Sequence, residues 1–120
     1  MSTVKTHLFL AAALLSPTLA MAGNFATCLL DELPGTQNDN TAGAAAQVCG
    51  SKYPARYSGV EQGSGRGFFA YESGAECALD KAKDTRSQTA AGMIRVACNR
   101  LYDDKKPDLC KEFSLNCDSR

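Results

Sequence analysis

The sequence contains no tryptophan and only one histidine, His7. That histidine lies in an N-terminal stretch with the features of a secretory signal peptide, in which Lys5 is basic, residues 8–15 are apolar and Ala20-Met21-Ala22 offers small residues for cleavage. The apolar run is too short to cross a bilayer, which needs roughly 20 apolar residues. We therefore expect residues 1–22 to be removed during export to the periplasm, or alternatively to the medium, which leaves a chain with neither a histidine nor a membrane span.

The missing histidine and the balanced charge argue against several classes of function. Serine and cysteine hydrolases most often use histidine as their base. The chain has no Cys-x-x-Cys motif, which would indicate a thioredoxin-like redox site or a zinc ribbon. Thirteen basic side chains stand against 13 acidic ones, whereas nucleic-acid binding rests on clustered positive charge. We expect no enzyme activity, no cofactor, no metal site and no nucleic-acid partner.

One catalytic alternative does not need histidine, because a pair of carboxylates can carry out acid–base chemistry, as in glycosidases. Asp31 and Asp80 are the candidates, because they occupy matching positions in the two related segments described below. A cleft large enough for a sugar is hard to form in such a small domain. A small carboxylate-dependent envelope hydrolase is therefore the less favoured hypothesis, and surface positions for both residues are favoured.

Six cysteines remain after residue 22 in what we expect to be one domain, 23–120. A domain of this size has a thin core, and an even number of cysteines in an exported chain indicates disulfides. The spacing favours the pairs Cys28–Cys49, Cys77–Cys98 and Cys110–Cys117. Crossed pairing, Cys28–Cys98 with Cys49–Cys77, is the alternative.

Two segments of the chain align without a gap when one is shifted by 49 positions. Over residues 26–53 the shift gives 9 identities in 28 positions, including both cysteines. A fixed period of this kind predicts an internal repeat. The identical positions in the first segment are Ala26, Cys28, Leu30, Asp31, Thr36, Ala42, Gly43, Cys49 and Tyr53.

Each segment is predicted to form a short helix, a turn and a longer helix. Pro34-Gly35 interrupts the first segment, and apolar residues recur with a helical period in the second. Ser73 with Glu76 fits a capping box, Asn38 or Asp39 suits the start of one long helix, and Thr85 or Ser87 suits the other. We expect a mainly α fold in which two disulfide-linked helical hairpins pack as a small bundle. Its parts are repeat one (25–54), an insert (55–73), repeat two (74–103) and a disulfide-tied tail (104–120).

The insert contains Gly-Ser-Gly-Arg-Gly at 63–67, between residues that suit short strands, and we expect a β-hairpin-like segment. A phosphate-binding loop would follow a strand and open a helix, whereas this stretch precedes a strand-like run, so a turn is favoured. Arg66 at its tip is able to bind a carboxylate of a partner or of the protein itself. Phe68 and Phe69 would point to opposite faces of a strand, so that if one packs inward the other is exposed beside Arg66. All three are candidate partner contacts.

The pattern Cys-Leu-Leu-Asp-Glu-Leu-Pro-Gly followed by Cys-Gly-Ser-Lys-Tyr-Pro resembles small exported bacterial proteins of unassigned function. The resemblance covers residues 26–54 and, more loosely, 75–102. It implies a disulfide-bearing helical fold and transfers no activity. We expect a non-catalytic protein that binds another envelope or secreted protein, as an inhibitor or immunity-like factor. A structural or stress-related periplasmic protein is the alternative.

Overall fold

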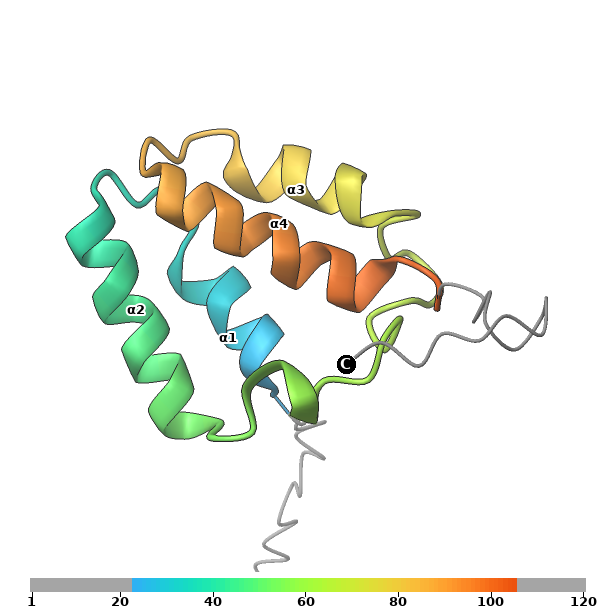
Figure 1. The fold of residues 1–120 in the computed structure, drawn as a ribbon. Helices are drawn as coiled ribbons and strands as arrows, with labels where there is room; N and C mark the ends of the chain where they lie inside the picture. The colour runs from blue at the N-terminus through green and yellow to red at the C-terminus, as the bar shows by residue number, and fades with distance from the viewer. Residues whose placement is uncertain (1–22, 106–120) are drawn as a thin grey trace, which may run out of the picture.

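The computed structural model describes residues 23–105, in which the chain forms four α-helices and one short 3-10 helix (Figure 1). The elements are α1 (Phe25–Glu32), α2 (Asp39–Lys52), η1 (Arg56–Gly59), α3 (Gly74–Ala82) and α4 (Gln88–Tyr102). The predicted mainly helical class is confirmed. The predicted signal peptide, 1–22, and the predicted Cys110–Cys117 pair lie outside the described residues.

Side-chain caps fix where the helices begin. The side chains of Asn38 and Ser87 accept hydrogen bonds from the amides three residues further on, so these residues and not their alternatives start α2 and α4. Ser73 caps α3 in the same way, as predicted. Asn24 and Thr27 form a reciprocal capping box at the start of α1, which the sequence analysis did not identify.

Helix α4 is the centre of the fold, because it packs against each of the other three α-helices. α3 runs along one side of it, and α1 lies on the other side, between α4 and α2 (Figure 1). Leu29 of α1, Leu33 just after it, and Ile94 and Leu101 of α4 are buried in the core between the helices. Val60, which follows η1, is buried there too. The insert therefore contributes to the core as well as linking the two helical pairs.

Each of the two disulfides among residues 23–105 joins cysteines of the same predicted repeat, and the crossed pairing does not occur. Cys28 bonds to Cys49 with α-carbons 5.7 Å apart, and Cys77 bonds to Cys98 with α-carbons 5.6 Å apart. All four cysteines are buried. Each bond ties a short helix to the long helix that follows it, so each helical pair carries its own covalent link.

The helices of the two pairs begin at matching positions. α1 and α3 start at residues 25 and 74, and α2 and α4 start at residues 39 and 88, so both starts differ by 49. The packing is not the same, because α3 lies along α4 more extensively than α1 lies along α2. α1 instead packs on α4 and η1. The internal repeat itself stays a prediction from the sequence.

The turns inside the two helical pairs bind each other. The carbonyl of Thr36, in the first turn, accepts hydrogen bonds of 3.1 Å from the amides of Arg86 and Ser87 in the second. The Ser87 hydroxyl donates to the carboxylate of Asp39 at the start of α2. This hydrogen bond, with another from the amide of Thr89, lowers the pKa of Asp39 below its ordinary value of 3.8. The two helical pairs are thus hydrogen-bonded to each other at the end of the bundle opposite the insert.

Candidate functional site

The insert, residues 55–73, contains no strand, so the predicted β-hairpin-like segment is wrong. It forms η1 and then a series of turns. The backbone amides of Gly63 and Gly65 donate hydrogen bonds of 2.8 and 2.9 Å to the carbonyls of Arg100 and Leu101. These amides are therefore committed to the end of α4 and are not available to pair with a facing strand.

The glycine-rich stretch 63–67 is a turn that caps the C-terminus of α4. The last carbonyls of a helix have no partner inside the helix and need donors from elsewhere. Gly63 has a φ of 79°, in the left-handed region that favours glycine. At Gly65 a β-carbon would lie 2.9 Å from the Tyr102 ring and 3.0 Å from the Leu101 side chain. The glycines let the backbone approach the helix end, so that their amides bind its carbonyls. In a phosphate-binding loop the amides would instead be free to bind an anion.

Two side chains of the insert complete this cap. The Arg66 guanidinium donates a 2.9 Å hydrogen bond to the Tyr102 carbonyl and lies 3.1 Å from the Asp104 carboxylate. The Gln62 amide donates to the carbonyls of Asn99 and Asp103 at 2.8 and 2.9 Å. A positive charge is also favourable at a helix C-terminus. The sequence predicts that Arg66 binds a carboxylate either of a partner or of the protein itself. In the structure it binds one of the protein itself, that of Asp104.

The first residue after the insert, Gly74, is also bound to the C-terminal end of α4. The amide of Gly74, the first residue of α3, donates a 2.8 Å hydrogen bond to the Asp103 carboxylate. A β-carbon on Gly74 would lie 2.6 Å from the α-carbon of Asn99, so α3 and α4 touch closely there. The segment between Arg66 and Gly74 is therefore held at both ends on the C-terminal turn of α4.

Phe68 and Phe69 lie in this held segment and are almost fully exposed. Their exposed fractions are 95% and 100%, so the expected placement on opposite faces of a strand does not occur. That expectation is wrong because the segment is not a strand and its residues do not alternate between two faces. The two rings contact each other edge to face, with centroids 5.5 Å apart. Phe69 has a φ of 67°, which is uncommon for a residue other than glycine.

A hollow of about 410 Å³ opens beside Phe69. Its walls are the side chains of Phe69, Ala70, Tyr71, Glu76 and Tyr102. The Tyr71 and Tyr102 rings are half-buried and meet edge to face at 5.2 Å. One carboxylate oxygen of Glu76 accepts a 3.0 Å hydrogen bond from the amide of Glu72. We call this hollow the aromatic hollow.

The hydroxyl of Tyr71, which precedes α3, donates a hydrogen bond to the carboxylate of Asp80. Asp80 lies on α3, one turn after Glu76. This bond, with a smaller effect of burial, raises the pKa of Tyr71 to about 12. It also lowers the pKa of Asp80, and Lys83, 3.7 Å from the same carboxylate, adds to that lowering. Tyr71 is thus held as a neutral phenol and Asp80 as a carboxylate.

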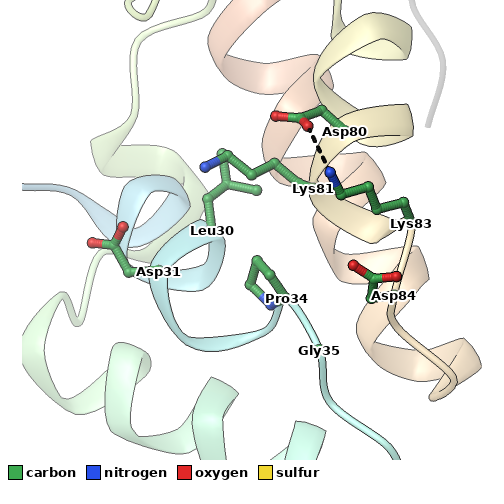
Figure 2. Close-up of a pocket in the computed structure, with 8 residues that line it drawn as sticks. All are labelled: Leu30, Asp31, Pro34, Gly35, Asp80, Lys81, Lys83 and Asp84. Atoms are coloured by element: carbon green, nitrogen blue, oxygen red, sulfur yellow. Dashed lines mark ion pairs between the residues drawn. The ribbon is translucent and has the colours of Figure 1, made fainter.

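Asp31 and Asp80 line a second hollow of about 520 Å³ between the two helical pairs (Figure 2). Figure 2 shows them on opposite sides of it, with Leu30 and Lys81 between them and Asp80 paired with Lys83. A general acid needs a raised pKa, whereas that of Asp80 is lowered. The structure thus places both predicted carboxylates at one hollow, with Asp80 held ionised and so unsuited to act as the general acid.

The sequence identifies Phe68, Phe69 and Arg66 but not the aromatic hollow. Of the other residues that line it, the sequence singles out only Glu76, as the capping-box partner of Ser73. The Glu76 assignment holds in part, because its amide donates to the Ser73 hydroxyl, whereas its carboxylate accepts from the amide of Glu72 and not from that of Ser73. No motif links these residues, because the hollow arises only when α3 and the insert meet at the end of α4.

No family model, curated protein or solved structure matches this chain. Within residues 23–105 no helix is both long enough and apolar enough to cross a membrane. In the same residues no group of three or more histidine, cysteine or acidic side chains is arranged to hold a metal ion. The resemblance to small exported bacterial proteins stays a prediction.

Proposed function

We propose that this protein is an exported, non-catalytic factor of the cell envelope that binds another protein through its Phe68–Phe69 loop. The proposal rests on one observation: two adjacent phenylalanines are almost fully exposed on a segment whose two ends are fixed. Exposed apolar groups of this kind mark interaction sites. Burying a phenylalanine contributes about 1.5–3 kcal/mol, so this pair offers a substantial gain to a partner that covers it.

The cap on α4 supports this function because it reduces the cost of binding. A loop that is ordered only on association loses conformational entropy at that moment. Here Gly63, Gly65 and Arg66 already hold the loop to α4. An inhibitor or immunity-like protein needs such a prepared surface, because it has to recognise one partner with high affinity.

The disulfides support export to an oxidising compartment, and we take the periplasm as the site of action. Two buried disulfides in a chain of this size are typical of secreted and periplasmic domains. The matching helix starts also favour the internal repeat, in which the insert is the segment that neither copy contains. The binding loop is then an addition to a duplicated helical scaffold.

A recovery experiment from envelope extract tests the proposed function. The baits are the wild type, the double variant Phe68→Ala with Phe69→Ala, and Leu79→Ala. Leu79 is the matched control, because it is an exposed apolar residue (79%) on α3, outside the loop. We expect a partner that the wild type and Leu79→Ala recover and the double variant loses. Equal recovery by all three baits would contradict the assignment of the loop as the interface.

A further inference from the structure

We propose that the aromatic hollow binds the side chain of a lysine or arginine of the partner protein. This inference rests on the proposed function for the nature of the partner, and it adds the chemistry of the residue that the partner presents. The hollow adjoins the exposed tip, because Phe69 belongs to both. A partner that covers the two phenylalanines therefore also covers the hollow.

The walls of the hollow suit an organic cation. Three of its five lining side chains are aromatic, namely Phe69, Tyr71 and Tyr102. The faces of aromatic rings carry partial negative charge and attract ammonium and guanidinium groups within roughly 6 Å. The edge-to-face contact of the two tyrosines makes their rings nearly perpendicular, with 82° between their planes. A cation in the hollow is therefore able to meet more than one ring.

A carboxylate at the rim supplies the full negative charge. Glu76 is exposed and lies in the first turn of α3. None of the ion pairs among residues 23–105 involves Glu76, whereas Asp80 and Asp104 are paired with Lys83 and Arg66. Among the residues that line the hollow, Glu76 is the acidic one, and an incoming cation meets it without displacing a basic side chain of the described chain.

The same charges disfavour a lipid surface as the occupant. Two exposed phenylalanines are also able to insert into a bilayer interface, but such anchoring is strengthened by basic residues near the surface. Beside Phe68 and Phe69 stand Glu72 and Glu76, and Arg66 is paired with Asp104. Anionic headgroups would be repelled by these carboxylates. Lysine and arginine fit better, because their apolar stems pack on aromatic rings while their charge reaches the carboxylate.

Titration with small probes tests the hollow independently of any partner. The probe is Nα-acetyl-arginine methylamide, and its neutral isostere Nα-acetyl-citrulline methylamide is the control, followed by amide chemical shifts of the labelled protein. We expect the arginine probe, and not the citrulline probe, to shift Tyr71, Glu76 and Tyr102. Equal shifts with both probes, or no shift with either, would overturn the proposal.

The variant Glu76→Gln removes the charge and keeps the cap, because glutamine is also able to accept the hydrogen bond from the amide of Glu72. We expect it to weaken binding of the arginine probe roughly three- to ten-fold, the range set by one cation–carboxylate contact next to aromatic rings. Glu32→Gln, on α1, is the matched control and should bind as the wild type does. Unchanged affinity in Glu76→Gln, with unfolding like that of the wild type, would overturn the proposal.

Two further measurements separate this inference from the proposed function. If Phe68→Ala loses the envelope partner while Glu76→Gln retains it at full strength, the protein-binding function stands and the cation site fails. If vesicles of phosphatidylethanolamine and phosphatidylglycerol bind the wild type and not Phe68→Ala, the tip is a lipid anchor and both proposals fail. We expect no vesicle binding, and we expect Glu76→Gln to weaken recovery of the partner.

Discussion

The backbone amide of Gly65 donates a 2.9 Å hydrogen bond to the carbonyl of Leu101, which joins the insert to the last turn of α4. This contact depends on the missing side chain, because a β-carbon at position 65 would lie 3.1 Å from the same carbonyl oxygen. The insert and the helix end are therefore fitted to each other at backbone level.

We expect Gly65→Ala to lower the free energy of unfolding by about 1–3 kcal/mol, the cost of forcing an extra carbon into a packed contact. Urea unfolding followed by circular dichroism measures it. Gly67→Ala is the control in the same loop, because no atom lies within 4 Å of its added β-carbon. Equal losses in the two variants would show that the close approach at Gly65 does not matter.

Because the backbone at Phe69 is strained, replacing this residue with glycine should raise the stability of the protein and weaken its binding to the partner. A left-handed φ costs a residue other than glycine roughly 1–2 kcal/mol, and the Phe69 ring is fully exposed and returns little packing. Phe69→Gly should therefore unfold at a higher temperature than the wild type and recover less partner. Phe68→Gly should show only the loss of partner. A lower melting temperature for Phe69→Gly would mean that the ring contact with Phe68 stabilises the loop.

The hydrogen bonds that join the Asp39 carboxylate to Ser87 and Thr89 should weaken in acid. Hydrogen bonds from Ser87 and Thr89 lower the pKa of Asp39 in the folded state below 3.8. A lowered folded pKa contributes stability above the unfolded pKa, and that stability is lost as the pH falls through the folded value. Melting temperatures measured from pH 7 down to pH 2 should fall below about pH 4.

Asp39→Asn should melt at a lower temperature than the wild type at pH 7 and show a shallower fall in acid. Part of the fall should remain, because the pKa of Asp80 is lowered as well. Asp31→Asn is the control, because no hydrogen bond to the Asp31 carboxylate occurs among the described residues. A wild-type acid profile in Asp39→Asn would refute the role of this carboxylate.

Tyr71 should ionise only in strongly alkaline solution. Its pKa is raised to about 12, chiefly by the hydrogen bond to Asp80, so the stability it contributes is present below pH 10 and is lost as the pH rises through about 12. An alkaline titration followed by tyrosinate absorbance should show this late step. Asp80→Asn should move it towards the ordinary value of 10, whereas Asp84→Asn should leave it in place. A late step that persists in Tyr71→Phe belongs to another tyrosine.

The two disulfides should stabilise the fold by similar amounts, because each closes a loop with a sequence separation of 21. On the chain-entropy model each contributes about 3 kcal/mol. Replacing Cys28 and Cys49, or Cys77 and Cys98, with alanine should therefore lower the free energy of unfolding by comparable amounts in denaturant titrations. A much smaller effect for one pair would show that its helices are held together in the unfolded chain by other means.

The helices and the disulfide pairs followed from the sequence because they rest on local signals. Asn38, Ser73 and Ser87 are cap residues at the right distance from apolar periodic runs. The cysteine spacing then placed Cys28 beside Cys49 once each segment was understood as two helices joined by a turn.

The shape of the insert did not follow, because its hydrogen-bond partners lie about 40 residues away. Gly63 and Gly65 pair with Arg100 and Leu101, and no local pattern shows that the end of α4 needs donors. Aromatic and β-branched residues in the insert suit strands, and the hydrogen bonds to these distant carbonyls override that preference. The aromatic hollow was missed for the same reason, since Tyr71, Glu76 and Tyr102 meet only after that cap forms.

The position of the disulfides has a consequence for the loop. Within the described residues no covalent bond except the main chain joins the first helical pair to the second, because each disulfide closes inside its own pair. A protease that cuts after Phe68 or Phe69 would thus convert the protein into two separate chains, each cross-linked by its own disulfide. Among the described residues, noncovalent contacts would then keep the halves together: α1 and α2 pack against α4, the two turns hydrogen-bond to each other, and residues 62–66 cap the end of α4. The loop that we assign to recognition is thus the only covalent link between the two cross-linked halves of residues 23–105, and cleavage at its exposed tip would divide the molecule into a split pair.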